Sequence, residues 1–349
     1  MRRFVRFGMW FCGVCVILIT ALLIFAAYLP GAEKVRFGAT YSVKYARDLG
    51  MDPWWTYKEL SAIGIRDWRV PVYWDMVEYR EGVYDFRLYD KILRDAEKNG
   101  SRVILVVGRR VPRWPECHVP EWAKRAPLDV QNEAVKKIVA TTVKRYRRNH
   151  AIIMWQVENE PLLGGFGDPK HWQCPPYTSG FFWELVEIVH ENDPSGTRKI
   201  ITTESGELGF WFAPSRIAML RTVEGIGFSF YRRAWTNFLG REKYRDYFRY
   251  PAFYRLKAWA YRLVIPHLSI FISELQAEPW GPKPFLQMTI AEQHEALSPQ
   301  KLREIIYDSK RTGFDRVYLW GVESALYLKH RGHPEYWDII KETFKTNLR

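Results

Sequence analysis

Apolar positions follow two different patterns along the chain. From Gly8 to Leu29 the sequence carries no charged residue, and a run of this length can cross a hydrocarbon core of about 30 Å as a helix. Beyond Val35, short β-branched and aromatic runs alternate with longer amphipathic stretches. That alternation is typical of βα units built around a parallel sheet.

Eight such units follow Val35. Helices are predicted at 87–100, where Leu88, Ile92, Leu93 and Ala96 share one face, at 298–313, which starts with Ser-Pro and stops at Gly, and at 335–344. The runs that we expect to form strands are 35–42, 65–74, 102–108, 152–160, 199–205, 225–231, 268–275 and 316–323.

Eight consecutive units predict an α/β fold, a (β/α)8 TIM barrel preceded by one N-terminal transmembrane helix. No repeat of fixed period and no low-complexity linker interrupts the body. We therefore expect two parts: residues 1–31 as a membrane anchor or signal segment, and residues 32–349 as the barrel domain.

The charges that flank the apolar segment bear on location. Arg2, Arg3 and Arg6 precede it, while Lys34 and Arg36 follow it together with an acid, so the positive-inside bias favours export of the body. A cleaved signal peptide is the alternative, although its apolar core is usually only about 7 to 15 residues long. We expect the domain to be membrane-anchored outside the cytoplasm, or secreted if the segment is cleaved.

The net charge of +13 is concentrated in two places. The three N-terminal arginines account for part of it, and residues 232–262 hold nine Lys or Arg against two acids. A local patch of this kind does not indicate a nucleic-acid-binding protein. The stretch is also rich in aromatics, and three roles stay open for it. It forms a lid over a substrate groove, or it contacts anionic lipid or an acidic polymer. The third role is a helix that covers the barrel, which the pattern of residues 255–264 favours.

Four cysteines are too few for a disulfide scaffold. Cys12 and Cys15 fall in the apolar segment, whereas Cys117 and Cys174 each lie in a Pro-rich loop that contains Trp. The loops after the third and fourth strands are neighbours on one face of the predicted barrel, and an exported body permits oxidation. We predict a disulfide between Cys117 and Cys174, with two unrelated thiols as the alternative.

Two carboxylates stand at strand ends, where TIM barrels carry their chemistry. Pro161 stops the fourth strand and leaves Asn159 and Glu160 at its mouth, and the seventh strand ends in Glu274. These two acids face each other across the barrel axis. Glycoside cleavage requires such a pair, with one carboxyl to protonate the leaving oxygen and one to attack or stabilise the anomeric carbon.

Asn159-Glu160-Pro161, the second Glu and Trp320 on the eighth strand resemble clan A of the glycoside hydrolases, the superfamily of cellulases, β-mannanases and β-galactosidases. Residues 68–71 (WRVP) are similar to the strand-two arginine segment of its family-five, cellulase-like members, and 81–86 (EGVYDF) to a loop of the clan. The resemblance covers 35–344. Tyr79 replaces a usual proline and Arg109 follows the third strand where many members carry a histidine, so the family and the sugar stay open.

The resemblance implies a retaining O-glycoside hydrolase that cleaves a β-linked oligo- or polysaccharide by double displacement, with Glu160 as acid/base and Glu274 as nucleophile. Asn159 then binds the sugar 2-hydroxyl, Tyr231 hydrogen-bonds Glu274, and Trp320 stacks on the pyranose. The expected substrate-binding residues are Arg69, Asn159, Tyr231, Trp320 and Glu323.

Two other functions stay open: a catalytically silent glycan-binding protein on the same barrel, and a transglycosylase. Glu158 shares the parity of Glu160 on its strand, and an ion pair with Arg69 is its favoured role. The eight histidines show no paired metal spacing and no Gly-rich phosphate loop is present, so we expect no metal and no cofactor. The sugar, endo or exo action and the oligomeric state are not determined by the sequence.

Overall fold

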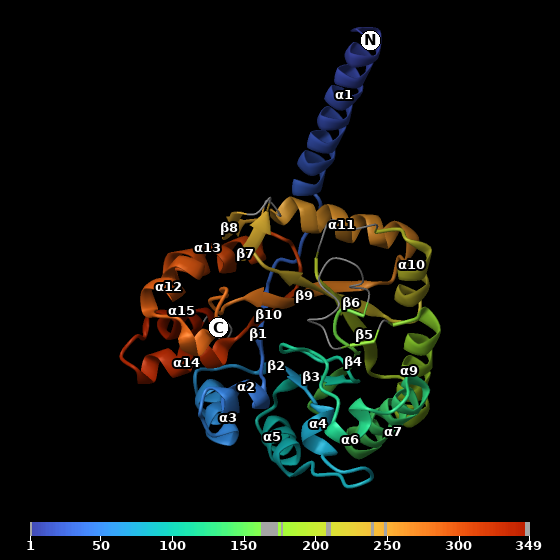
Figure 1. Ribbon diagram of the computed structural model, residues 1–349, viewed down its shortest axis with the longest axis vertical. Coiled ribbons are helices and arrows are strands. Elements are labelled where there is room, and N and C mark those ends of the chain that lie inside the picture. Colours follow the sequence, from blue (N-terminus) through green and yellow to red (C-terminus); the bar gives the residue numbers. More distant parts are fainter. Residues whose placement is uncertain are drawn as a thin grey trace.

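The computed structural model describes residues 2–161, 174–175, 177–206, 211–238, 241–247 and 250–345. Its centre is a closed barrel of eight parallel strands ringed by helices (Figure 1), so the predicted TIM barrel is confirmed. Around the barrel the strands follow the order β1, β10, β9, β6, β5, β4, β3, β2. Their bounds are β1 (Arg36–Thr40), β2 (Asp67–Pro71), β3 (Arg102–Val107), β4 (Ile152–Val157), β5 (Lys199–Glu204), β6 (Gly225–Phe230), β9 (Ser269–Gln276) and β10 (Arg316–Trp320).

Helices follow most strands and cover the outside of the barrel (Figure 1). A 3₁₀ turn, η1, spans Phe285–Gln287. The helices of the barrel domain are α2 (Val43–Asp48), α3 (Pro53–Ala62), α4 (Trp74–Val77), α5 (Arg87–Lys98), α6 (Glu121–Lys124), α7 (Leu128–Tyr146), α9 (Ser179–Asn192), α10 (Pro214–Leu220), α11 (Pro251–Val264), α12 (Ile290–Ala296), α13 (Pro299–Lys310), α14 (Val322–His330) and α15 (Glu335–Lys345).

The predicted helices form where the sequence placed them. In α5, Ile92, Leu93 and Ala96 are buried against the barrel. Ser298 caps α13, because its side chain accepts from the Lys301 N–H, and a proline occupies the first turn. The third prediction, at 335–344, corresponds to α15.

The inside of the barrel is a packed core rather than a pore. A cluster formed by Ile104, Met154, Ile201, Phe271 and Tyr318 fills it. Gly38 is required beside this cluster, because a Cβ there would lie 2.6 Å from the Asp67 carbonyl oxygen and 2.7 Å from the Tyr318 ring. Polar side chains are therefore left to the two ends of the barrel.

At β4 and β10 the strand stops three residues before its predicted end. β4 ends at Val157, because Glu158 and Glu160 adopt left-handed φ values of 57° and 46°, which no strand residue has. β10 ends at Trp320 because Gly321, at φ 82°, starts α14. Glu323, predicted to end the eighth strand, lies instead in the first turn of α14.

The N-terminal helix α1 (Arg2–Ala27) stands out from the barrel and meets it at α11 (Figure 1). Its C-terminal turns make this contact: the Phe25 ring lies 5.8 Å from Trp259 and Ala26 is fully buried. Among the described residues, no helix reaches the length and apolar character that a membrane span requires. The predicted transmembrane helix is therefore not supported by the structure.

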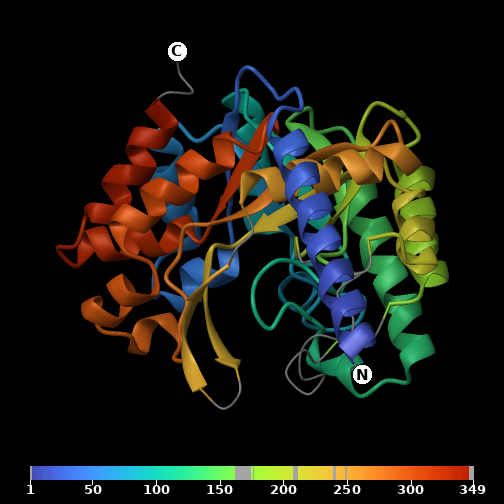
Figure 2. The same ribbon diagram turned by 90° about the horizontal axis from the view of Figure 1, so that it is seen from above.

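The basic aromatic stretch 232–262 forms two elements. The predicted helix is present and begins earlier than expected, as α11. The first half is an antiparallel hairpin of β7 (Arg233–Phe238) and β8 (Arg241–Asp246), which the sequence did not predict. Figure 2 shows the hairpin extending beyond the barrel on the side toward which the N-terminal end of α1 leans. Gln276 anchors its base by accepting from the Arg232 and Arg233 N–H groups.

Candidate active site

Glu160 and Glu274 lie at the carboxyl ends of β4 and β9. Both side chains are almost completely buried. Glu160 follows the last residue of its strand, and its N–H donates to the Thr203 hydroxyl at 2.9 Å. Its carboxyl oxygen Oε1 accepts a hydrogen bond of 2.6 Å from Ser229. Neighbouring strands β5 and β6 thus supply both contacts, which hold Glu160 in one orientation.

The surroundings of Glu160 favour its protonated form. Burial, together with the negative charges of Glu116 and Glu274, raises its pKa to about 8. A carboxyl group with this pKa holds its proton at neutral pH and can donate it.

Glu274 has the opposite surroundings. Its Oε1 accepts from Arg69 Nη1 at 2.8 Å, and its Oε2 accepts from the Tyr231 hydroxyl at 3.1 Å. Both carboxyl oxygens therefore receive a donor, and one of these donors is a fully buried guanidinium. Hydrogen bonds from a cation and a hydroxyl hold the two oxygens of Glu274 in one orientation. Tyr231 makes the contact that the resemblance implied.

Arg69 holds the site together from beneath. Its Nε donates to Gln156 at 2.7 Å and its Nη2 to Asn159 Oδ1 at 2.6 Å, in addition to the bond to Glu274. The side chain is fully buried and all of its nitrogens donate to protein groups. The prediction that Arg69 binds substrate is corrected on this geometry: it positions Glu274 and Asn159.

Asn159 presents one half of its amide to the protein. Its Oδ1 accepts from Arg69 and from Thr203, the latter at 2.8 Å. Within the described part of the chain its buried Nδ2 has no hydrogen-bond partner. Because an unsatisfied buried donor is costly, this amide is suited to donate to a ligand hydroxyl.

Glu158 does not pair with Arg69, contrary to the prediction. Its two oxygens accept from the backbone N–H groups of Arg109 and Arg110, at 3.0 and 2.6 Å. The left-handed turn after Val157 breaks the strand parity on which the prediction rested. A Cβ at Gly108 would lie 2.4 Å from Glu158 Oε1, so glycine is needed at that position.

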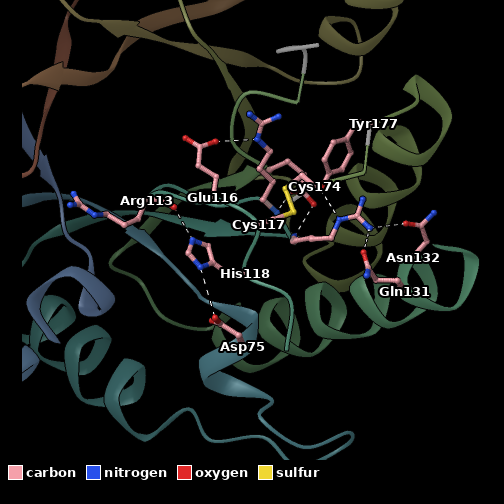
Figure 3. The surroundings of a disulfide bond; sticks show 12 residues. Asp75, Arg113, Glu116, Cys117, His118, Gln131, Asn132, Cys174 and Tyr177 are labelled. Carbon is pink, nitrogen blue, oxygen red and sulfur yellow. Dashed lines mark hydrogen bonds and ion pairs between the residues drawn. A yellow bond between two sulfur atoms is a disulfide. The ribbon is translucent and has the colours of Figure 1, made fainter. Parts of the chain in front are cut away.

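A third carboxylate, Glu116, joins the site from the loop after β3. Arg110 Nε donates to its Oε2 at 3.1 Å (Figure 3). Burial raises the pKa of Glu116; the Arg110 charge opposes the rise and the Glu274 charge adds to it. The sequence analysis missed this residue, since nothing in a loop segment reading RWPEC marks one acid as facing the barrel mouth.

The predicted disulfide is present. Cys117 and Cys174 are bonded with their Cα atoms 5.3 Å apart, and 57 positions separate them in sequence (Figure 3). The bond ties the loop after β3 to the loop after β4. Since Cys117 follows Glu116 directly, the crosslink also limits the movement of the third carboxylate.

The two remaining residues that were expected to bind substrate, Trp320 and Glu323, differ in their contacts. Trp320 is the last residue of β10, is 5% exposed, and its indole N–H has no partner among the described residues. Glu323 instead accepts from the backbone N–H of Ser42 at 2.5 Å, and burial raises its pKa to about 7. Glu323 thus fastens the chain after β1, a structural contact that the sequence analysis did not anticipate.

Ser229, Gln156 and Thr203 were also missed by the sequence analysis. Each lies on a barrel strand at the end that carries the carboxylates. The available signal was period-two parity: Ser229 has the parity of Gly225 and Gly227 on β6. Among the residues that the structure describes, no three His, Cys, Asp or Glu side chains are arranged so that they could hold a metal ion.

Comparison with known proteins relates part of this chain to beta-galactosidases. A family model described as beta-galactosidase matches residues 57–168, a segment that contains Arg69, Asn159 and Glu160. Beta-galactosidase GalA of Bacillus licheniformis is 33% identical over 105 residues, which are 25% of this chain and 16% of that protein.

Two solved structures illustrate the likeness in fold. The beta-galactosidase of Bacillus circulans sp. alkalophilus superposes with a TM-score of 0.54 at 13% identity, over 90% of this chain and 56% of that one. Xylanase XynB of Paenibacillus barcinonensis gives 0.52 at 18% identity, over 84% and 88%.

The chain spans about half the length of the solved beta-galactosidases that it matches. The family match supports the resemblance to clan A glycoside hydrolases over residues 57–168, and the solved structures show that the barrel fold is shared.

Proposed function

We propose that the protein is a retaining glycoside hydrolase acting on β-linked glycans, with Glu160 as acid/base and Glu274 as nucleophile. The observation that carries the proposal is the contrast between two buried carboxyl groups at facing strand ends. One has a pKa raised to about 8, and the other accepts hydrogen bonds from a guanidinium and a phenol. Retaining cleavage requires this division of roles.

In the first step, the Glu274 carboxylate attacks the anomeric carbon. The bond between that carbon and the glycosidic oxygen breaks, and Glu160 gives its proton to the departing oxygen. The product is a glycosyl ester on Glu274 and a free aglycone. Glu160 is now ionised and can act as a base.

In the second step, Glu160 takes a proton from water while the water oxygen attacks the anomeric carbon. The ester bond breaks, Glu274 is again a carboxylate, and the sugar leaves with its original anomeric configuration. If another sugar hydroxyl replaces the water, the same intermediate gives transglycosylation.

Other residues are assigned to substrate positioning. The unpaired Asn159 Nδ2 donates to the sugar 2-hydroxyl beside Glu274. Trp320 offers an aromatic surface for the apolar face of the sugar ring. Tyr231 keeps Glu274 aligned through its 3.1 Å hydrogen bond.

The matched relatives suggest which sugars to try first. They include beta-galactosidases, a xylanase and an exo-beta-1,4-mannosidase. We propose a β-linked glycan as the substrate class, with β-galactosides as the first candidates.

The test is turnover of 4-nitrophenyl β-galactoside, glucoside, mannoside and xyloside by the purified chain. The anomeric configuration of the first product is read by NMR, and a 2-fluoro glycoside is used to trap the ester on the peptide that contains Glu274. Glu224→Gln is a matched control. Glu224 lies just before β6 and accepts from the Ile200 N–H near the start of β5, at the opposite end of the barrel. Inversion at the anomeric carbon would exclude the retaining mechanism, and binding without turnover would indicate a silent glycan-binding protein.

We also propose that the domain lies outside the cytoplasm. The disulfide between Cys117 and Cys174 supports this location, because such bonds persist in oxidising compartments. Cell fractionation with thiol alkylation before and after reduction tests it. Export predicts that the two cysteines react only after reduction. A chain that begins at Ala32, compared with the full chain in the same fractions, shows whether residues 1–31 direct the location.

A further inference from the structure

A cluster of three side chains joins loops from separate parts of the barrel mouth. It comprises Tyr45 in α2, Arg113 in the loop after β3, and Glu278 just after β9. In the strand order, β2, β1 and β10 separate β3 from β9. The cluster therefore crosses the sector of the mouth that these three strands form, away from the end of β4.

The contacts within the cluster are close and well directed. Arg113 donates to both oxygens of Glu278, at 2.8 and 3.0 Å. Tyr45 donates to Glu278 Oε1 at 2.8 Å, and the Arg113 guanidinium carbon lies 3.2 Å from the centroid of the Tyr45 ring. The side chains of Glu278 and Arg113 are only 3% and 14% exposed.

The backbone on either side also holds the cluster in place. A Cβ at Gly321 would lie 2.3 Å from Glu278 Oε2, so Glu278 lies directly on the backbone at the end of β10. On the other side, His118 Nε2 donates to the Arg113 carbonyl oxygen at 2.9 Å. Figure 3 shows the Arg113 side chain extending away from the disulfide, beyond His118.

The cluster adjoins the surface assigned to the sugar. The Arg113 guanidinium carbon lies 5.7 Å from the Trp320 ring centroid. In the proposed reaction Glu160 protonates the leaving oxygen, so the aglycone extends toward the end of β4 and the glycone lies on the side of Trp320. A further sugar attached beyond the glycone would have to occupy the space that Arg113 and Glu278 fill.

We propose that Tyr45, Arg113 and Glu278 form a wall that ends the glycone side of the site after a single sugar. The wall restricts cleavage to the non-reducing ends of chains, with release of monosaccharide. This inference rests on the proposed function and defines its mode of action. Because separating a buried, bidentate ion pair is costly, the wall is a fixed boundary that the substrate does not displace.

The experiment uses the sugar that the 4-nitrophenyl panel identifies. Its β-linked oligosaccharides, from disaccharide to pentasaccharide, are offered with the non-reducing end either free or chemically blocked, and early products are separated by chromatography. The wild-type chain is expected to release monosaccharide alone and to lose all turnover on the blocked series.

The wall is opened with the double variant Arg113→Ala/Glu278→Ala, which leaves neither charge buried alone. This variant is expected to lose exclusive monosaccharide release and to gain turnover on the blocked series. The single variant Arg113→Lys keeps a cation opposite Glu278 and is expected to give the same products as the wild-type chain. The control is Asp193→Ala/Arg198→Ala, an ion pair of similar burial before β5, for which the product pattern should not change.

The outcomes separate the two proposals. A wild-type chain that hydrolyses 4-nitrophenyl glycosides but also cleaves the blocked oligosaccharides overturns the wall and leaves the proposed function intact. Failure on every aryl glycoside overturns the proposed function, and the wall with it. Folding of the double variant is checked by circular dichroism. If it does not fold, the wild-type chain and the Arg113→Lys variant on blocked substrates still decide whether the wall exists.

Discussion

The ends of β4 and β9 present the same residue type in two different ways. β4 ends at Val157, three residues before Glu160, and Glu160 has a left-handed backbone conformation at the mouth. β9 continues as a strand through Glu274 to Gln276, with a bulge next to Glu274, because its register with β6 and β10 shifts by one residue between Ile272 and Leu275. Glu160 accepts from a neutral hydroxyl and faces other acids, whereas Glu274 accepts from a guanidinium. Environment, rather than residue type, thus distinguishes the two carboxyl groups: it raises the pKa of Glu160 and places a guanidinium against Glu274.

Left-handed backbone at a residue other than glycine costs of order 1 kcal/mol or more and persists only where the surroundings enforce it. Around Glu160 the enforcing contacts come from Thr203 and Ser229. At Glu158 they come from the N–H groups of Arg109 and Arg110. The backbone at the β4 end therefore depends on contacts from β5, from β6 and from the loop after β3.

The largest effect is expected from removing the β9 carboxylate. Glu274→Gln keeps the size of the side chain and an oxygen that can accept from Arg69, and its NH2 group can donate to the Tyr231 hydroxyl, but it cannot attack the anomeric carbon. Turnover should fall by about 10⁴-fold or more, as when other catalytic nucleophiles are removed. Steady-state kinetics on the best 4-nitrophenyl glycoside measures this loss. A loss of less than about 10²-fold would mean that Glu274 is not the nucleophile.

Removing the β4 carboxyl group should have an effect that depends on the substrate. General acid catalysis contributes about 10²- to 10⁴-fold, and Glu160→Ala should lose this on sugars with poor leaving groups. Dinitrophenyl glycosides need no protonation and should lose far less. Added azide should restore turnover by attacking the glycosyl ester. Equal losses on both substrates, without azide rescue, would contradict the role of Glu160.

The disulfide tests whether the two loops depend on each other. Cys117→Ser/Cys174→Ser removes a crosslink that closes a loop of 57 positions, worth about 4 kcal/mol in the chain-entropy model. Chemical denaturation should show this loss, with turnover retained when the variant is assayed well below its melting temperature. The wild-type chain after reduction is the matched comparison, because it lacks the crosslink without any serine substitution. An unchanged midpoint of unfolding in the double variant would show that the crosslink does not stabilise the domain.

The smallest expected effect is a shift in pH dependence. Since the free enzyme needs Glu160 protonated, kcat/KM should fall as pH rises through about 8. Glu116 adds to the rise in this pKa, so Glu116→Gln removes a negative charge, lowers the pKa of Glu160 and moves the alkaline limb to lower pH. Glu121→Gln, an exposed acid on α6, is the control. A limb that stays in place in Glu116→Gln would show that this charge does not act on Glu160.

Much of the barrel could be predicted because its signals are local. Each strand carries its own β-branched or aromatic run, and each predicted helix shows its apolar face and its stop residue. The strand ends predicted at Glu160 and Glu323 were wrong, and both lie at the mouth of the barrel. There the chain leaves regular geometry under the influence of groups from other strands, and parity along the strand no longer indicates where a side chain points.

Part of the site was also visible in the sequence, since Asn159, Glu160 and Glu274 close apolar runs. Glu116, Arg113 and Glu278 were not assigned to it. All three lie in loops, where no period relates sequence position to direction. Their partners are far along the chain: Glu278 lies 165 positions from Arg113.

The sequence by itself determined the barrel, the two glutamates at facing strand ends and the compatibility of the two cysteines, because hydrophobic periodicity and strand order specify which residues reach one end of a sheet. The tertiary structure decided that the pKa of Glu160 is raised, that Arg69 supports the site from below, and that Tyr45, Arg113 and Glu278 meet across the mouth. These properties depend on burial and on charges contributed by distant segments. Both arise only when the barrel closes and brings separate loops to within hydrogen-bonding distance.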